Sequence, residues 1–382
     1  MPYDDLRSYL DALDLDRQLR HLTEELDPAQ GPAEALRAAA ELGDHAPGLY
    51  LDNLHGLPEA QLTLGLLGSW TNHAIALGLP PTTPLRAQIE EFGRRWHSPV
   101  GPVTHRADPA WDEYVLTGTE VDLAAVLPLF ELGGDEQQAS DRAPVLAALP
   151  GHRTPDLRLR RFEPRSRNRL ALRLTAGDPL AHHPRQADLP VALALGTEPM
   201  LTVAAATVRS GCAYTRAAAL RGAPCPVTTG PLTGFEVPWG CEALLEGVLE
   251  ARAQGATHAP VVRIDRISHR ASPIFDSLRR TGEHLTGPAA CVRLLDRLRA
   301  DFPDVRAVNS LYGDGRLAIV ALTPRHPGLA EAVTARCHGL APGHSVITVS
   351  GDVDPFDLPQ VLGALAAGPA LTLDTTRPAV PV

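Results

Sequence analysis

The feature that most constrains the fold is a strand–turn–helix pattern near the C-terminus, residues 344–367. An apolar stretch at 345–349 runs into the acidic turn 351–355, and a helical pattern follows to residue 367. Asp354 is predicted as the N-cap of this helix, with Pro355 in its first turn. The preceding elements alternate in the same way, with a helix, a strand and a helix expected at 289–300, 317–322 and 328–337. The alternation predicts an α/β domain of parallel strands joined by right-handed crossovers.

The middle of the chain has a different pattern, made of short β-like runs separated by Gly or Pro. Strands of this length and spacing predict a barrel or a split sheet. A polar segment at 133–142 is predicted as a loop. The predicted strands lie at 114–116, 157–161, 170–174, 191–195 and 261–264.

The N-terminal part is predicted to be largely helical, with helices over residues 3–42, a short strand at 48–51 and a helix after Ser69. The proline-rich stretch 99–109 is the natural first domain boundary. We therefore expect an α/β, multidomain (α+β) fold with three domains. They are an N-terminal α/β domain at 1–108, a central barrel at 109–287 and a C-terminal α/β domain at 288–382.

The composition excludes several classes of partner. The net charge is −10 and no basic cluster offsets it, so nucleic acid is not an expected partner. No apolar run approaches the roughly 18 residues that a membrane span needs. The acidic, polar N-terminus differs from a signal peptide, so a cytoplasmic location is expected.

The reactive side chains are also limited by composition. The chain has no lysine, which excludes a Schiff base or a lysine general base. No two of its five cysteines have the C-x-x-C spacing, so they are predicted as free thiols rather than metal ligands. They are Cys212, Cys225, Cys241, Cys291 and Cys337.

Several short segments carry a family resemblance through their shared order along the chain. They include 5–7, 115–118, 127–128, 167–170, 217–222, 246–247, 267–272 and the C-terminal 345–367. In this order the chain resembles the UbiD family of prenylated-FMN-dependent decarboxylases over nearly its whole length. It is identified as a divergent, shortened member.

The resemblance implies a carboxy-lyase that acts without oxidation on an aromatic or α,β-unsaturated carboxylic acid. The implied central domain is a split β-barrel of the flavin-reductase-like type that holds prenylated FMN, with a divalent metal, Mn or Mg, at its phosphate. The cofactor serves such enzymes as an electron sink. The resemblance further implies a flavin prenyltransferase as supplier of the cofactor, a small-molecule carboxylic acid as substrate and a homo-oligomeric state.

The family's functional residues are carried over by ungapped counting from Asn168. The catalytic arginine falls on Arg161, which would also face the cofactor. A metal-binding asparagine falls on Asp156, whose carboxylate suits a hard cation. His182 and His183 are candidate metal ligands, and Arg325 is a candidate for binding the cofactor phosphate.

Other family positions are altered. The metal-binding histidine and glutamate fall on Gly177 and Ala213, and the phosphate-binding lysine falls on Thr323. The loop that carries two catalytic glutamates after Glu246-Gly247 is absent. Glu250 and His258 are the nearby proton carriers and become the candidate acid/base residues.

These departures leave more than one function open. The first is a carboxy-lyase with a non-standard acid/base arrangement. The second is a flavin-free homologue, repurposed for other chemistry on an organic acid or serving as a partner subunit, in which no cofactor is expected. The second is favoured by the convergence of the three losses on the metal–phosphate site. The third is a binding or scaffold protein without chemistry.

Overall fold

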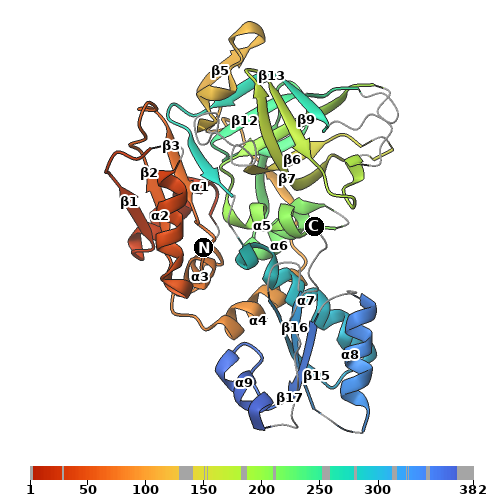
Figure 1. Ribbon diagram of the computed structural model, residues 1–382. Coiled ribbons are helices and arrows are strands. Elements are labelled where there is room, and N and C mark those ends of the chain that lie inside the picture. The colour runs from red at the N-terminus through yellow and green to blue at the C-terminus, as the bar shows by residue number, and fades with distance from the viewer. Residues whose placement is uncertain are drawn as a thin grey trace, which may run out of the picture. The chain divides into compact units, whose positions relative to one another are not determined.

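The computed structural model places helices and strands along most of the chain (Figure 1). It describes residues 3–27, 30–128, 141–149, 151–152, 154–181, 187–209, 212–251, 259–278, 282–311, 316–323, 325, 327–340 and 345–367. The chain divides into two compact units, residues 1–286 and 287–382. The division into three domains stays a prediction.

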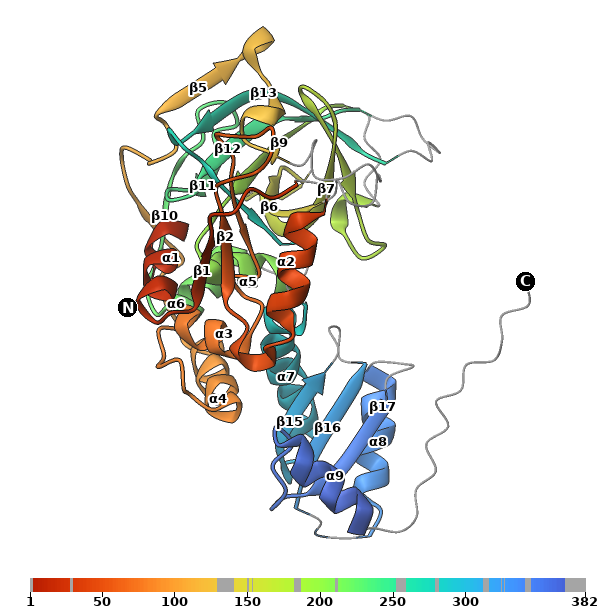
Figure 2. The ribbon, with the colours of Figure 1, turned by 60° about the vertical axis from the view of Figure 1, so that its left-hand side comes forward.

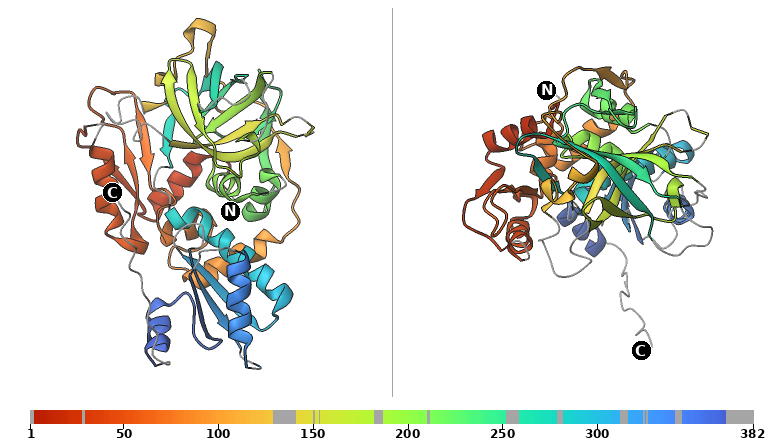
Figure 3. Two further views of the ribbon diagram at one scale, coloured as in Figure 1. Left: turned by 45° about the vertical axis from the view of Figure 1, so that its right-hand side comes forward. Right: turned by 90° about the horizontal axis from the view of Figure 1, so that it is seen from above.

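The centre of the first unit is a closed antiparallel barrel, as predicted (Figures 1 and 3). Its strand order is β12-β9-β6-β7-β8-β13, and β12 pairs with β13 to close it. A further strand, β5 (Tyr114–Thr117), extends the sheet beside β13. The barrel strands are β6 (Asp141–Ala147), β7 (Asp156–Ser166), β8 (Arg169–Arg173), β9 (Leu189–Leu195), β12 (Ala243–Leu249) and β13 (Val261–His269).

Alternation along each strand separates the inside of the barrel from its outside. Val145, Phe162, Leu172 and Leu193 belong to one buried core, which fills the barrel. The closure has an irregularity at Gly247, where a bulge lies between β12 and β13. A Cβ atom there would lie 1.9 Å from the carbonyl oxygen of Arg263, so glycine is needed for the close approach.

Two helices, α5 (Pro199–Thr207) and α6 (Ala213–Arg221), pack on the outside of the barrel. They contact outward residues of the barrel strands, among them Leu146 and Leu157. A small sheet next to them has the order β11-β10-β4 and consists of β4 (Val103–His105), β10 (Cys225–Thr229) and β11 (Glu236–Pro238).

The N-terminal part contains a second sheet, of order β1-β2-β3-β14 (Figure 2). The prediction of helices throughout residues 3–42 is wrong, because β1 interrupts them. Arg17 has a positive φ of 57° after the first helix, and β1 then pairs with β2. The elements are α1 (Leu6–Leu15), β1 (Leu19–Leu22), α2 (Gly31–Ala40), β2 (Gly48–Leu51), β3 (Gln61–Leu64), α3 (Trp70–Ala76), α4 (Leu85–Trp96) and β14 (Ile274–Ser277).

Short 3-10 helices connect several of these elements. They are η1 (Gly43–His45), η2 (Gly118–Glu120), η3 (Leu123–Ala125) and η5 (Pro179–Ala181). No helix in the described ranges combines the length and apolarity that crossing a membrane requires.

The second unit has the predicted α/β alternation with one difference in topology. The strands β16 and β17 are parallel, whereas β15 and β16 are antiparallel. The strand β15 was not predicted, and its short connection to β16 makes a hairpin rather than a crossover. The elements are α7 (Gly282–Asp301), β15 (Val305–Leu311), β16 (Leu317–Leu322), α8 (Leu329–Leu340), β17 (Ser345–Ser350) and α9 (Leu358–Ala367).

The capping residue of α9 differs from the prediction. Asp354 Oδ1 accepts a hydrogen bond from the backbone N–H of Phe356 at 3.0 Å, within the preceding turn. Asp357 Oδ1 accepts from the N–H of Gln360 at 3.1 Å, which is the pattern of an N-cap. The helix therefore begins three residues later than the acidic turn suggested, and Pro355 precedes it.

Candidate functional site

Three arginines lie side by side across the barrel. In the strand register Arg142 of β6 is the partner of Arg161 of β7, and Arg161 is the partner of Arg173 of β8. Directly opposed residues of antiparallel strands share one face of the sheet. Because Phe162 points into the core, its neighbour Arg161 points outward. We call Arg142, Arg161 and Arg173 the outer arginine row.

One carboxylate compensates part of this charge. Glu163, two residues from Arg161 and on the same face, accepts hydrogen bonds from Arg173 Nε at 2.6 Å and Nη2 at 3.0 Å. It also accepts from Arg165 Nη2 at 2.9 Å. Within the described part of the chain, the side chains of Arg142 and Arg161 have no hydrogen-bond or ion-pair partner.

Like charges directly opposite one another destabilise a sheet. A row of three guanidinium groups, two of them without a partner among the described residues, is therefore poorly explained as a structural feature of the strands. Planar guanidinium groups bind carboxylates and phosphates through paired hydrogen bonds. The arrangement can hold an anion on the outer surface of β6, β7 and β8.

Glu250 lies close to the same surface. Its Oε1 accepts a hydrogen bond from Arg169 Nε at 3.1 Å. Arg169 and Arg173 are four residues apart in β8, so both lie on the outer face of that strand. The structure thus brings the carboxylate of Glu250 to the face that carries the arginine row. His258, the other predicted proton carrier, lies outside the described residues.

The inner side of β7 carries a compact cluster of charges. Asp156 accepts hydrogen bonds from Arg158 Nε at 2.9 Å and from Arg160 Nη2. Arg160 also donates from Nε to Asp178 Oδ2 and from Nη1 to the carbonyl oxygen of Val145, both at 2.9 Å. The side chain of Arg160 is only 1% exposed, so these contacts replace its water. We call Asp156, Arg158, Arg160 and Asp178 the inner ion-pair cluster.

The contacts of the inner ion-pair cluster determine whether these residues can bind a metal ion that bridges to the phosphate of a flavin. The predicted ligand Asp156 is already neutralised by two guanidinium groups, and Ala213 is a buried methyl group. His182 and His183 lie outside the described residues. Among the residues that the structure describes, no group of three His, Cys, Asp or Glu side chains is arranged to hold a metal ion. These residues do not fit a metal-bridged flavin phosphate.

Arg325, the predicted phosphate-binding residue, belongs to the second unit. Its Nε forms an ion pair with Asp304 Oδ1 at 2.7 Å, and 68% of its side chain is exposed. Thr323 accepts a hydrogen bond from Arg306 Nε at 3.0 Å. Both positions are therefore paired within their own unit.

Two carboxylates that were not predicted as site residues, Glu246 and Asp276, accept hydrogen bonds from neighbouring groups. Glu246 of β12 is fully buried and accepts hydrogen bonds from Thr233 N at 3.0 Å and Thr233 Oγ1 at 2.7 Å. The Glu246-Gly247 pair thus anchors the 230–234 turn to the barrel. Glu163 could have been found from sequence, because its spacing of two from Arg161 places both on one face of a strand.

Asp276 of β14 is a second acid outside the predicted set. Thr63 Oγ1 donates a hydrogen bond to Asp276 Oδ1 at 3.1 Å. Burial, and to a smaller extent the charge of Asp141, raise the pKa of Asp276 to about 7. Asp141 itself accepts hydrogen bonds from Ser277 Oγ at 2.5 Å and from Leu278 N at 2.8 Å. The two acids thus lie at the junction of β14 with the start of β6.

Comparisons with known proteins agree with this architecture. The domain family described as the 3-octaprenyl-4-hydroxybenzoate carboxy-lyase Rift-related domain (UbiD) matches residues 103–282, and the corresponding C-terminal domain matches 283–374. A phenolic acid decarboxylase of Streptomyces sp. (strain D7) is 41% identical over 403 aligned residues, covering 96% of this chain and 85% of the relative. The phenolic acid decarboxylase of Bacillus subtilis (strain 168) is 34% identical, with the same coverage.

Solved structures show the same fold. The vanillic acid decarboxylase of Sedimentibacter hydroxybenzoicus in its open form is 30% identical, has a TM-score of 0.86 and covers 96% of this chain and 84% of its own. The UbiD-class enzyme HmfF from Pelotomaculum thermopropionicum in complex with prFMN is 22% identical, with a TM-score of 0.80, 95% of this chain covered and 90% of its own. This second likeness concerns the fold alone.

The chain belongs to the UbiD family of carboxy-lyases. The family prediction, the mixed α/β architecture with its barrel and the carboxy-lyase class are thereby confirmed.

Proposed function

We propose that this chain is a carboxy-lyase that removes the carboxyl group of a phenolic acid as CO₂. The observation that carries the proposal is Arg161, at the centre of the outer arginine row and without a partner among the described residues. The phenolic substrate class is taken from the relatives that are 41% and 34% identical to the chain. A soluble carboxylic acid would approach the exposed outer face of β7.

In this proposal Arg161 binds the substrate carboxylate through two parallel N–H···O bonds, and Arg142 adds charge beside it. Glu163 holds Arg173 in place through its two hydrogen bonds. A proton is delivered to the ring carbon that carries the carboxylate. The bond from this carbon to the carboxylate then breaks, its electron pair returns to the ring and CO₂ leaves. Glu250, which reaches the same face, is the proposed proton carrier.

The proposal includes no divalent metal, because Asp156 is engaged by Arg158 and Arg160. Prenylated FMN supplies an electron sink in the family by resemblance, and no step here is assigned to it. A cytoplasmic location, a homo-oligomeric state and a flavin prenyltransferase as partner remain predictions.

The test compares Arg161→Ala with Arg167→Ala, using CO₂ release from phenolic acids as the measurement. Arg167 is a matched surface arginine in the β7–β8 turn, paired with Asp122 at 3.1 Å and 68% exposed. Loss of a charge-assisted carboxylate contact is expected to lower kcat/KM roughly 100-fold in Arg161→Ala. Arg161→Lys should recover part of this loss, and Arg167→Ala should stay within about twofold. Unchanged kcat/KM in Arg161→Ala would refute the proposal.

A second candidate function is favoured by the inner ion-pair cluster and by the absence of the glutamate-bearing loop. In this candidate the chain is a flavin-free homologue that acts on an organic acid by other chemistry or assists an intact paralogue. The absorbance spectrum of protein co-expressed with a flavin prenyltransferase separates the two candidates. Stoichiometric bound flavin contradicts the second, whereas a colourless protein that releases no CO₂ contradicts the first.

A further inference from the structure

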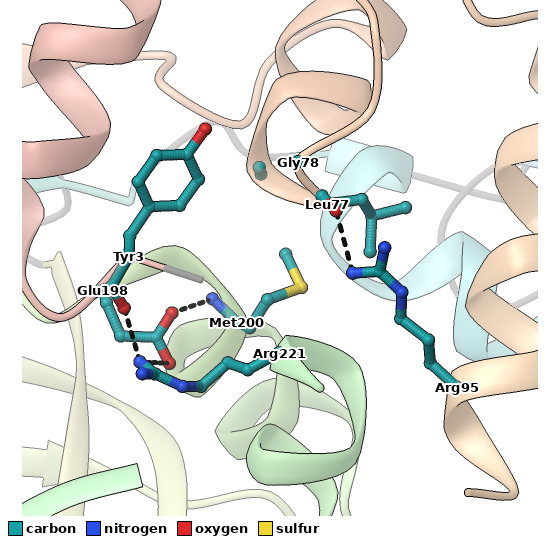
Figure 4. Close-up of a pocket in the computed structure, with 8 residues that line it drawn as sticks. Tyr3, Leu77, Gly78, Arg95, Glu198, Met200 and Arg221 are labelled. Carbon is teal, nitrogen blue, oxygen red and sulfur yellow. Dashed lines mark hydrogen bonds and ion pairs between the residues drawn. The ribbon is translucent and has the colours of Figure 1, made fainter. Parts of the chain in front are cut away.

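A partly enclosed cavity of about 80 Å³ lies within the first unit (Figure 4), and no residue of the outer arginine row lines it. It is formed by the N-terminal segment, the end of α3, α4 and the helices α5 and α6. One part of its wall is apolar and includes Ala76, Leu77 and Met200. The other part carries the charged residues Arg95, Glu198 and Arg221.

Glu198 contributes an unmatched acceptor to this cavity. Its Oε2 accepts the backbone N–H of Met200 at 2.8 Å, as the N-cap of α5. Its Oε1 accepts no hydrogen bond and lies 3.5 Å from Arg221 Nη1 (Figure 4). Only 6% of the side chain is exposed. The ion pair with Arg221 leaves Oε1 without a hydrogen bond, and a buried acceptor that lacks one costs about 1–3 kcal/mol, so a donor is expected beside it.

Arg221 contributes an unmatched donor. Its Nη1 donates to the carbonyl oxygen of Tyr3, and its Nη2 donates to Asp4 Oδ1 at 2.9 Å. Its Nε has no hydrogen-bond partner, although only 2% of the side chain is exposed. The same ion pair therefore presents one free acceptor and one free donor.

The second arginine of the cavity is already paired. Arg95 donates from Nη1 to the carbonyl oxygens of Leu77 and Leu220 at 2.8 and 3.0 Å, and its Nε contacts Glu91 at 2.6 Å. Asp4 likewise compensates Arg221. With both cations paired, the cavity offers no excess positive charge to an anion. Its occupant is therefore expected to be neutral.

A hydroxyl group both donates and accepts, which matches the two unmatched atoms. One water needs about 10–15 Å³ of such space, so a cavity of about 80 Å³ holds roughly five to eight heavy atoms. Water would form the missing hydrogen bonds of Glu198 and Arg221. It would also leave the apolar wall of the cavity in contact with water, which is unfavourable. We infer that the cavity binds a small neutral molecule with one hydroxyl on an apolar body, of the size of phenol. This inference does not rest on the proposed catalytic site, since it uses different residues.

The experiment titrates the full chain with phenol and with benzene, by calorimetry and ligand-observed NMR. A ligand of this size is expected to bind with a Kd on the order of 1 mM. Benzene should bind about tenfold or more weakly, because it leaves both polar atoms unmatched. Met200→Phe fills the apolar part and should weaken phenol binding about tenfold. Leu15→Ala, at a side chain that is 85% exposed, is the control and should bind like the wild type.

Three results would overturn the inference. They are the lack of saturable phenol binding, equal affinity for benzene and phenol, and unchanged phenol binding in a folded Met200→Phe variant. A crystal of the wild type soaked in phenol gives a reading that does not depend on any variant. Phenol density between Met200 and Glu198 supports the inference, and water alone in the cavity refutes it.

Discussion

At the scale of single residues, Asp276 shows how burial changes the chemistry of a side chain. Its carboxyl group has one hydroxyl donor, Thr63, and a like charge nearby on Asp141. Loss of solvation outweighs that single hydrogen bond, so the pKa rises to about 7. The folded chain thus holds a proton on Asp276 at pH values where the unfolded chain has released it.

The raised pKa of Asp276 gives a signed prediction for stability. A group with a folded pKa near 7 and an ordinary value of 3.8 stabilises the fold fully below pH 4. This contribution falls as the pH rises through 7, by about 1.4 kcal/mol for each unit of pKa difference. Asp276→Asn removes this contribution, so the variant should lose less stability than the wild type between about pH 4 and pH 7, the range between the two pKa values.

Urea unfolding at these pH values, followed by tryptophan fluorescence, measures the effect. All tryptophans lie in the first unit, which contains Asp276. Thr63→Val is the companion variant, because removing a donor to the ionised form should raise the pKa of Asp276 further. If the free energy of unfolding changes equally with pH in the wild type and in Asp276→Asn, Asp276 titrates as an ordinary surface acid.

At the scale of elements, β7 carries both charge clusters, one on each face. Arg160 points into the inner ion-pair cluster, whereas its neighbour Arg161 points outward. The period of two in a strand is sufficient to separate them. A one-residue slip in the register of β7 would exchange the two arginines, so the packing of Phe162 in the core fixes which one faces the solvent.

The inner cluster gives a prediction for the barrel. Arg160→Ala leaves Asp156 and Asp178 as buried carboxylates with reduced compensation, and should lower the free energy of unfolding by about 3–5 kcal/mol. Replacing Arg160, Asp156 and Asp178 by Met, Asn and Asn should recover most of this loss, because both buried carboxylates are then removed together with Arg160. Urea midpoints monitored by tryptophan fluorescence measure both variants, with Arg167→Ala as the control. A urea midpoint of Arg160→Ala equal to that of the wild type would mean that the inner ion-pair cluster contributes little to the free energy of unfolding.

The sequence predicted individual elements better than their pairing. The strand β16 has its predicted bounds, and the helix α9 ends where predicted, at Ala367, because each has an apolar pattern. Arg161 was predicted on a strand, and the structure places it there. The outer arginine row was missed, because 133–142 was predicted as a loop, whereas Arg142 is the second residue of β6. The register between two strands depends on tertiary packing, which the pattern of a single strand does not contain.

Glu198 and Arg221 were missed for a related reason. Glu198 is the N-cap of α5, and Arg221 is the last residue of α6. At the ends of helices the local sequence indicates capping but does not predict a cavity. The N-terminal segment, which is distant in sequence, contacts Arg221 through Tyr3 and Asp4. Such a cavity exists only in the folded first unit.

At the scale of the whole molecule, the family's barrel is retained while parts of its expected site are changed. The closed barrel and the α/β C-terminal unit agree with UbiD-family proteins over 96% of the chain. Within that frame, ion pairs engage Asp156, and Ala213 has no ligand atom. The account therefore predicts carboxy-lyase activity that depends on Arg161 and not on a divalent metal.

The most direct measurement is CO₂ release from a panel of phenolic acids by protein co-expressed with a flavin prenyltransferase, with added Mn²⁺ and with EDTA. The account predicts CO₂ release that is the same in both conditions, within about twofold, because arginines neutralise Asp156 where a metal would bind. Release that requires Mn²⁺ would contradict the assignment of the inner ion-pair cluster. No release from any phenolic acid in either condition would contradict the carboxy-lyase function itself.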